Sequence, residues 1–234
     1  MQMIIICGGF ATRLGNLAKT IPKSMIDING KTFLEHQIQN LKKNKIKDII
    51  LCVGHLSEKI EEYFGNGKKF GVNIKYSYDK DKPLGPIGAV KNAEKLLDDE
   101  FFIMYGDSYL SIDFQDVYKF FKNHDKPALM VVYKNMDKYD KSNLIIKDNL
   151  AIGYGEKQRN SEMIYIDYGT SILTKNLLKN VPKDTFFSTG DFFSKLIENR
   201  DLLTYEVKNR FYHIGNPDAL AELRKYIKSQ WKYS

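Results

Sequence analysis

The chain has 234 residues, of which 43% are hydrophobic and 28% are charged, with a formal net charge of +7. This composition excludes a disordered chain and a fibrous repeat. No apolar run approaches the roughly 20 residues that cross a bilayer, and two cysteines supply neither a disulfide scaffold nor a zinc-binding spacing. From the apolar runs and the cysteine count we expect no membrane partner and a cytoplasmic location. Because basic and acidic residues are interleaved, we also expect no nucleic-acid partner.

The first two thirds of the sequence alternate short apolar runs with helical patterns. Buried strands are predicted over residues 3–7, 48–53, 72–78, 101–105 and 128–133, and helices over residues 33–41, 57–63, 88–97 and 117–123. The helix at 57–63 is expected to take Ser57 as its cap. This alternation is typical of βαβ units and therefore of a parallel sheet with helices on both faces.

The pattern changes after Tyr133. Antiparallel strands are predicted over residues 143–147, 150–155 and 163–173, followed by a helix over 192–199, a strand over 202–207 and a last helix that opens at Pro217. We expect an α/β fold with a Rossmann-like, mostly parallel (mixed) sheet flanked by helices. A smaller antiparallel sub-region completes a single domain, 1–234, in two parts, 1–133 and 134–234.

A loop with unusual residues follows the first predicted strand. Gly8 and Gly9 allow a close backbone approach to a ligand, so that amides can bind phosphate oxygens. Arg13 and Lys23 would add positive charge over the same site. The loop matches neither the P-loop nor the dinucleotide fingerprint. Ligands bind at the carboxyl ends of strands in open parallel sheets, and a long loop without periodicity is usually functional.

The loop residues resemble the signature of sugar-1-phosphate nucleotidylyltransferases. The family pattern Gly-Gly-x-Gly-Thr-Arg-Leu, then Pro-Lys-Pro-Met, is matched from Gly8 to Lys23, with Ala11 for the third glycine and Ser24 for the second proline. The sequence is most similar to mannose- and heptose-1-phosphate guanylyltransferases. The resemblance implies a GT-A-like nucleotidyltransferase fold, with a nucleotide-binding first part and a sugar-phosphate-binding second part.

Four further segments carry the resemblance. They are Pro83–Gly88 in the base pocket, Gly106-Asp107 at the metal, Glu156-Lys157 with Asp167 and Gly169 at the sugar, and the late segment around His213.

The resemblance implies attack of a sugar 1-phosphate on the α-phosphorus of a nucleoside triphosphate, with release of pyrophosphate. Charge neutralisation and positioning would then dominate catalysis. The implied nucleotide-binding residues are Gly8, Gly9, Ala11, Thr12, Arg13, Asp79, Pro83, Gly85 and Gly88. The implied sugar-phosphate-binding residues are Lys23, Glu156, Lys157, Asp167, Gly169 and His213. Arg13, Lys23 and Asp107 would be catalytic, and Asp107 would bind Mg²⁺.

Asp79 favours guanine, because a carboxylate accepts from the N1–H and the amino group of that base. A surface role for Asp79 is the alternative, and cytidylyl transfer to a phosphorylated sugar or alcohol is the next function. A metal-dependent glycosyltransferase is disfavoured, since Asp107-Ser108-Tyr109 lacks its Asp-x-Asp. A catalytically inactive nucleotide-sugar-binding module is disfavoured by the retained Arg13 and Lys23.

The second metal ligand differs from the family pattern, because His213 stands where relatives carry an aspartate. Water, a His213 contact to substrate phosphate, or a carboxylate such as Asp218 are the alternatives. The partners implied are a nucleoside triphosphate, with GTP favoured, and a sugar 1-phosphate of the mannose or heptose type. A role in capsule or lipopolysaccharide biosynthesis is implied as well, and assembly into a homo-oligomer is left open.

Overall fold

The computed structural model describes residues 1–8, 20–79, 82–155 and 159–230. Its main sheet is formed by β1 (Gln2–Ile6), β4 (Asp48–Val53), β5 (Asn73–Tyr78), β6 (Glu100–Tyr105), β8 (Ala128–Lys134), β9 (Leu144–Lys147), β10 (Leu150–Tyr154), β11 (Tyr165–Thr174) and β12 (Leu202–Val207). The strand order is β5-β4-β1-β6-β11-β8-β12-β10-β9. Two small pairs join β2 (Asp27–Ile28) to β3 (Lys31–Thr32) and β7 (Ser108–Tyr109) to β13 (Tyr212–His213).

The sheet is parallel in its first part and mixed in its second. β4 pairs in parallel with β5 and with β1, and β1 pairs in parallel with β6. β11 then runs antiparallel between β6 and β8, whereas β12 is parallel to β8. The expected α/β fold with a mixed sheet is confirmed, and the antiparallel pairs gather in the second part of the chain, as predicted.

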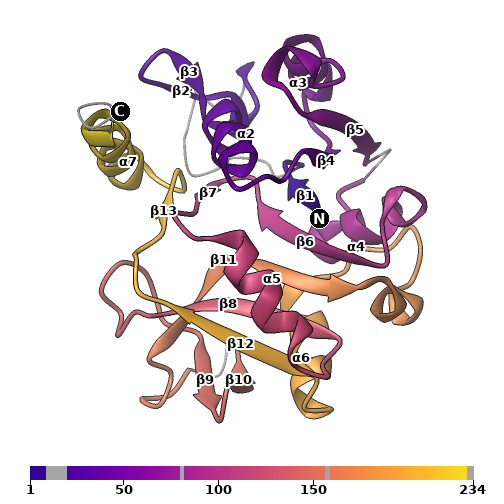
Figure 1. Ribbon diagram of the computed structural model, residues 1–234, viewed down its shortest axis with the longest axis vertical. Coiled ribbons are helices and arrows are strands. Elements are labelled where there is room, and N and C mark those ends of the chain that lie inside the picture. The colour runs from indigo at the N-terminus through magenta and orange to yellow at the C-terminus, as the bar shows by residue number, and fades with distance from the viewer. Residues whose placement is uncertain (9–19, 80–81, 156–158, 231–234) are drawn as a thin grey trace.

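The helices are α2 (Phe33–Lys43), α3 (Ser57–Phe64), α4 (Gly85–Asn92), α5 (Phe114–Lys122), α6 (Thr189–Glu198) and α7 (Pro217–Gln230). Short 3-10 turns are η2 (Lys23–Met25), η3 (Lys68–Phe70), η4 (Glu94–Leu96) and η5 (Lys175–Asn180). α2, α3 and α5 pack against one face of the sheet, while α4 and α6 pack against the other (Figure 1). No helix in the described part is long and apolar enough to cross a membrane.

Strand β1 shows why the sheet is covered on both faces. Met3 and Ile5 join the core beneath α2 and α3, whereas Ile4 joins the core beneath α4. Side chains of a strand alternate between its two faces, so an unbroken apolar run requires cover on both sides. The continuous apolar run at residues 3–7 therefore predicted a central strand, and β1 is one.

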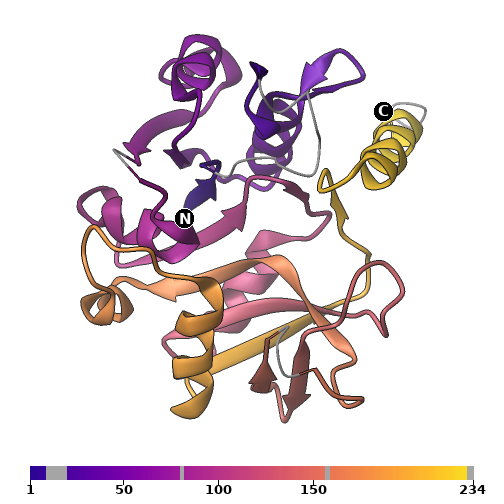
Figure 2. The ribbon, with the colours of Figure 1, turned by 180° about the vertical axis from the view of Figure 1, so that it is seen from behind.

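The C-terminal helix returns to the N-terminal part of the molecule. Leu220, Leu223 and Ile227 of α7 form a third apolar cluster with Ile26 and Ile28, next to β2 and β3. The two views show α7 beside this hairpin and away from the main sheet (Figures 1 and 2). The predicted division at residue 133 stays a prediction, since the sheet itself is continuous from β6 to β11.

Two helix starts differ from the sequence expectation. α3 begins at Ser57, but its cap position is held by Leu56 in the left-handed region, so the prediction of Ser57 as cap was wrong. α4 begins at Gly85 and not at Gly88, although Gly-Pro-Ile-Gly is poor helix-forming sequence. Tertiary contacts explain this start, because the carbonyl of Phe187 accepts from the N–H groups of Ile87 and Gly88.

Candidate active site

The order of the parallel strands locates the site. Along the sheet, β1 lies between β4, which continues outward to β5, and β6. The chain passes from β1 outward through β4 to β5 and then crosses back to β6 on the other side of β1. Ligands bind outside the carboxyl ends of parallel strands where the strand order reverses in this way. Gly8 follows β1 and Gly106-Asp107 follows β6, so two predicted motifs meet at one edge of the sheet.

Gly106 allows the ends of β1 and β6 to approach closely. Its N–H donates to the carbonyl of Ile6 at 3.0 Å. A Cβ atom at this position would lie 2.5 Å from the same carbonyl oxygen and 3.1 Å from the Cys7 sulfur. Only glycine fits here, and the next residue, Asp107, is thereby placed directly over the end of β1.

Lys23 and Asp107 form an ion pair across this edge. The Lys23 ammonium, in η2, donates to Oδ2 of Asp107 at 2.6 Å, and 84 positions of sequence separate the two residues. The Lys23 side chain is 18% exposed and that of Asp107 is 39% exposed. In the ligand-free protein the predicted catalytic cation is therefore neutralised by the predicted metal carboxylate.

Gln37, which the sequence analysis did not single out, holds the turn that carries Asp107. Its side-chain amide, buried in α2, donates to the carbonyl of Tyr105 at 3.1 Å and to that of Ser108 at 2.8 Å. These two carbonyls flank Asp107 in sequence. A glutamine in mid-helix has no motif of its own, so the tertiary structure alone could reveal this role.

Asp107 also lines a cavity of about 300 Å³. Three other predicted site residues line it as well, namely Asp167, Gly169 and His213. The cavity lies between the end of β6, the middle of β11 and the β13 pair. The remaining lining residues are Tyr105, Ser108, Asp140, Lys141, Asn143, Tyr154, Ile166, Tyr168, Thr189, Phe211 and Gly215.

Asp167 is held by neutral donors inside this cavity. The hydroxyl of Tyr105 donates to its Oδ2 at 3.1 Å, and the N–H of Gly169 donates to its Oδ1 at 2.8 Å. Burial raises the pKa of Asp167 to about 6, and these two hydrogen bonds oppose the rise. Gly169 adopts a φ of +101° beside Ser108, a conformation that favours glycine. This group of donors and acceptors suits ligand hydroxyls.

His213 lies next to Asp107 through the β7–β13 pair. Ser108 is its register partner, and the N–H of Ile214 donates to the carbonyl of Asp107 at 3.0 Å. The Nδ1 atom of His213 accepts from the N–H of Gly215 at 3.0 Å. Burial lowers the pKa of His213, although the Asp107 charge opposes this shift. Burial thus favours the neutral imidazole, and its Nδ1 lone pair is occupied by the N–H of Gly215.

This donor set fits a magnesium ion that is held mainly by substrate. Among the described residues, no three His, Cys, Asp or Glu side chains could hold a metal together. Asp218, one alternative for a second ligand, is exposed in the first turn of α7 and does not line the cavity. Mg²⁺ is usually bound by one or two carboxylates and completes its shell with water and phosphate oxygens. The single carboxylate of Asp107 meets that requirement.

Asp79 lies at the other side of the edge, next to Gly8 at the end of β1. Its Oδ2 is 3.2 Å from the position that a Cβ atom on Gly8 would take, and its backbone N–H donates to the carbonyl of Val53. Burial raises the pKa of Asp79, and a backbone hydrogen bond from Leu84 opposes it. Its Oδ1 is buried and has no hydrogen-bond partner among the residues that the structure describes. A buried acceptor without a donor is costly, so this atom is suited to a donor from a ligand.

The glycines of α4 are fixed by the segment that covers its N-terminus. Gly85 has a φ of +71°, and a Cβ atom there would lie 2.8 Å from the carbonyl oxygen of Phe187. A Cβ atom on Gly88 would lie 2.7 Å from the carbonyl oxygen of Thr185. Pro83 precedes them and is exposed. These glycines serve close packing here, and their predicted contact with a base stays a prediction.

Several predicted site residues lie outside the described part of the chain: Gly9, Ala11, Thr12, Arg13, Glu156 and Lys157. Of the others, Lys23 and Asp107 are in contact, and Gly8 is next to Asp79. Asp107, Asp167, Gly169 and His213 share the cavity. Sequence reasoning missed Tyr105, Asn143 and Lys141, which line the same cavity. Only Tyr105 had a signal, since it directly precedes the Gly-Asp pair.

Comparison with known proteins agrees with the family that the sequence motifs indicated. A family profile described as nucleotidyl transferase matches residues 2–230. The D-glycero-alpha-D-manno-heptose 1-phosphate guanylyltransferase of Campylobacter jejuni is 35% identical over 219 residues, which cover 93% of this chain and 96% of that protein. Mannose-1-phosphate guanyltransferase 2 of Candida glabrata is 29% identical, covering 98% of this chain but 65% of that longer protein.

A solved structure also matches over nearly the full length. The crystal structure of HddC from Yersinia pseudotuberculosis, complexed with GMP-PN, superposes with a TM-score of 0.81 at 26% sequence identity. The match covers 97% of this chain and 99% of that one.

Proposed function

The chain belongs to the nucleotidyl transferase family, as its motifs predicted, and we propose that it transfers a guanylyl group from GTP to a heptose or mannose 1-phosphate. The observation that carries this proposal is the meeting of Lys23 and Asp107 at the sheet edge, beside a cavity lined with hydroxyl-binding groups. A phosphate-binding cation, a metal carboxylate and a sugar-sized polar cavity are the three parts that this reaction needs.

The reaction joins two polyanions. An oxygen of the sugar 1-phosphate forms a bond to the α-phosphorus of GTP, the bond from that phosphorus to the bridging oxygen of the β-phosphate breaks, and pyrophosphate leaves. The barrier consists largely of charge repulsion and misalignment, so positioned cations supply most of the catalysis. No covalent intermediate with the protein is required.

Among the described residues, Lys23 places a positive charge next to Asp107, where the reacting phosphates would lie. When both phosphates are bound, its ammonium exchanges Asp107 for a phosphate oxygen and lies where negative charge accumulates. Asp107 is then free to hold Mg²⁺, which would supply further charge neutralisation on the phosphates. Arg13 and the backbone of Gly8, Gly9, Ala11 and Thr12 are proposed for the outer phosphates of GTP.

Asp79 supports guanine as the base. Its unpartnered, buried Oδ1 is an acceptor only, and guanine presents two adjacent donors, N1–H and the amino group. Cytosine presents a single amino donor at the equivalent edge and would satisfy the carboxylate less completely. Pro83, Gly85 and Gly88 are proposed to border the same base.

Asp167, Gly169 and His213 support a hydroxyl-bearing acceptor. Asp167 can accept from a sugar hydroxyl, and Tyr105 fixes the position of that carboxylate. Glu156 and Lys157 are proposed for a hydroxyl and the phosphate, respectively. The heptose acceptor is favoured over mannose because the heptose-specific relative matches this chain over 96% of its own length.

The test is a matrix of GTP, ATP, CTP, UTP and dTTP against heptose 1-phosphate, mannose 1-phosphate and other sugar 1-phosphates, with Mg²⁺ present or removed by chelation. Pyrophosphate release and the mass of the product are measured. We expect release with GTP and a heptose or mannose acceptor, and none without Mg²⁺. If no combination of triphosphate and sugar 1-phosphate releases pyrophosphate, the result would instead support a catalytically inactive binding module. A preference for CTP would contradict the guanylyl assignment.

A further inference from the structure

The segment 135–142, between β8 and β9, is built to hold one shape. Met136 and Asp137 both adopt left-handed backbone conformations, with φ values of 51° and 59°. Such conformations are unfavourable for residues other than glycine and persist only where the surrounding structure enforces them. Residues with such backbone conformations are found more often at active sites and ligand-binding segments than elsewhere. The segment 135–142 is therefore a candidate for a functional role.

Two buried polar side chains enforce the shape from inside. Asn135 is 2% exposed, and its amide donates to the carbonyl of Asp140 at 2.6 Å and to the hydroxyl of Ser142 at 3.1 Å. The hydroxyl of Ser142, fully buried, accepts from the N–H of Asp137 at 3.0 Å. The N–H of Tyr139 donates to the side-chain oxygen of Asn135.

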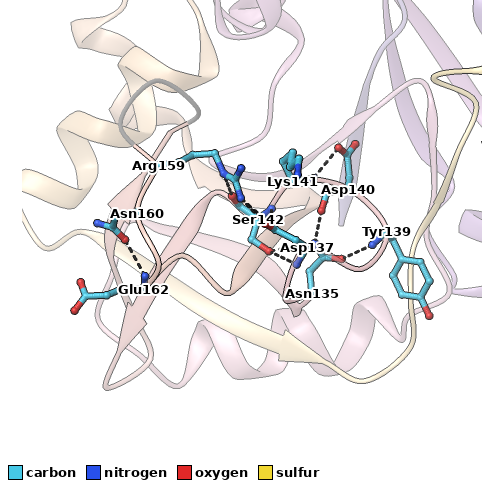
Figure 3. Close-up of polar contacts among 9 residues, drawn as sticks. All are labelled: Asn135, Asp137, Tyr139, Asp140, Lys141, Ser142, Arg159, Asn160 and Glu162. Atoms are coloured by element: carbon cyan, nitrogen blue, oxygen red, sulfur yellow. Dashed lines mark hydrogen bonds and ion pairs between the residues drawn. The ribbon is translucent and has the colours of Figure 1, made fainter.

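Arg159 closes the segment from outside (Figure 3). Its NH2 group contacts both carboxylate oxygens of Asp137 at 2.7 Å, and its Nε donates to the carbonyl of Ser142 at 3.0 Å. Asp137 in turn accepts from the N–H of Ser142 at 2.7 Å. These contacts lower the pKa of Asp137 to about 2, first through Ser142 and then through Arg159. One guanidinium therefore fastens both ends of the turn.

A second arginine holds the same segment on its other side. The guanidinium of Arg210 stacks 3.7 Å from the ring centre of Tyr139 and 4.5 Å from that of Tyr212, which directly precedes His213. Arg210 also pairs with Glu222 of α7. The segment is thus fixed relative to the β13 strand that borders the cavity.

Asp140 and Lys141 are the residues that this framework presents to the cavity. Both line it, and Asp140 caps its neighbour by accepting the N–H of Lys141 at 2.7 Å. The described lining contains three aspartates, Asp107, Asp140 and Asp167, and Lys141 is the only lysine or arginine within it. These carboxylates repel an anionic acceptor, and the positive charge of Lys141 offsets that repulsion by attracting the anion.

We propose that Lys141 binds the phosphate of the acceptor together with Lys157, and that Arg159 and Asp137 are positioning residues that hold Lys141 at the cavity. The inference rests on the proposed function, because the acceptor is the sugar 1-phosphate of that reaction. Among the described residues the Lys141 ammonium forms no ion pair, so it is available to the ligand. Its backbone is fixed, which reduces the entropy lost when the ligand binds.

The experiment compares Lys141→Ala with Lys138→Ala. Lys138 lies on the same segment, near the ring of Tyr139, and does not line the cavity, so the control makes the same charge change. We expect Lys141→Ala to raise the KM for the sugar 1-phosphate about 10-fold or more, the scale of one lost charge-assisted hydrogen bond. The KM for GTP should stay unchanged, Lys138→Ala should behave as wild type, and Lys141→Arg should recover most of the loss.

The positioning role is tested by Asp137→Asn and Arg159→Ala, with Arg159→Lys as the conservative variant. Each of the first two changes should raise the acceptor KM while the KM for GTP stays constant, and Arg159→Lys, which keeps the charge opposite Asp137, should show a smaller rise. A uniform loss of kcat with an unchanged acceptor KM would indicate a structural role only and would overturn this part.

The outcomes separate the two proposals. If the wild-type enzyme is active and the Lys141→Ala variant has the same KM for the sugar 1-phosphate, this inference is overturned and the proposed function stays intact. A wild-type enzyme that turns over no sugar 1-phosphate would overturn both.

Discussion

Lys23 and Asp107 neutralise each other at a separation of 2.6 Å. An ammonium without a counter-charge in a partly buried position is costly to desolvate, and the carboxylate removes that cost. In the proposed reaction the two groups would act separately, Lys23 on the phosphates and Asp107 on the metal ion.

At the residue scale we predict that Lys23→Ala lowers turnover by about 10²–10³, the effect of removing one preorganised transition-state charge contact. Steady-state pyrophosphate release measures this, with Lys31→Ala as a control that removes an equally charged side chain on the β2–β3 hairpin. The Lys23→Ala variant should still be activated by Mg²⁺, because the Lys23 ammonium competes with the metal ion for Asp107 and its removal leaves that carboxylate available. A loss below about threefold would contradict the role assigned to Lys23.

Asp167 gives a prediction about pH. Its pKa is raised by burial to about 6, above the roughly 3.9 of an unfolded aspartate, so the folded protein binds a proton more tightly between these values. The stability that Asp167 contributes is therefore complete below about pH 4 and is lost as the pH rises through about 6. Asn cannot ionise and escapes this loss.

The free energy of unfolding of Asp167→Asn, minus that of wild type, should therefore rise from pH 4 to pH 7 by on the order of 2–3 kcal/mol. Denaturant titrations at four pH values measure it, with the exposed Asp125→Asn as control. A difference that stays flat would show that folding leaves the pKa of Asp167 unchanged, and one that falls as the pH rises would show that folding lowers it; either result would contradict the raised pKa.

At the element scale, the ends of β1 and β6 bring Gly8 and Asp107 to one edge of the sheet. The N–H of Gly106 donates to the carbonyl of Ile6, a Cβ atom at Gly106 would overlap that carbonyl, and Gln37 of α2 fixes the turn beyond it. A helix on one face thus determines where a strand-end carboxylate lies.

Gly106→Ala is predicted to destabilise the protein by about 1–3 kcal/mol, because the added methyl group would overlap the Ile6 carbonyl and force the strand ends apart. Activity should fall more than stability accounts for, since Asp107 moves with the turn. Gly190→Ala in α6 is the matched control, because a Cβ atom there has ordinary clearance and alanine favours helix. Urea unfolding and turnover, measured side by side, test both; a Gly106→Ala protein of wild-type stability would refute the packing argument.

At the scale of the whole molecule, the site draws on both parts of the chain. β1 and β6 supply Gly8 and Asp107, β11 supplies Asp167 and Gly169, and the β13 strand supplies His213. α7 then packs against β2 and β3, so that the end of the chain covers the hairpin beside η2 and Lys23. The N-terminal and C-terminal parts of the chain are therefore joined by one sheet and by one returning helix.

Most strands and helices could be predicted from the sequence, with ends within a few residues. β4 is predicted from Asp48 to Val53 and found there, because its continuous apolar run can be buried only as a central strand. The start of α4 could not be predicted, because Gly85 is a poor helix former and the N-terminus of the helix is stabilised by the carbonyl of Phe187, which accepts from the N–H of Ile87 across 100 positions of sequence. The same holds for Leu56 in place of Ser57 at the cap of α3.

Sequence alone determined the family, the mixed α/β fold and the set of candidate residues, since short-range patterns of burial and motif order are written in neighbouring positions. Tertiary structure alone decided that Lys23 reaches Asp107, that Nδ1 of His213 accepts from the N–H of Gly215, and that Lys141 lines the cavity beside Asp107. The physical reason is that these contacts join residues through strand order and side-chain packing. A local pattern specifies an element, whereas the distance between two elements depends on everything packed between them.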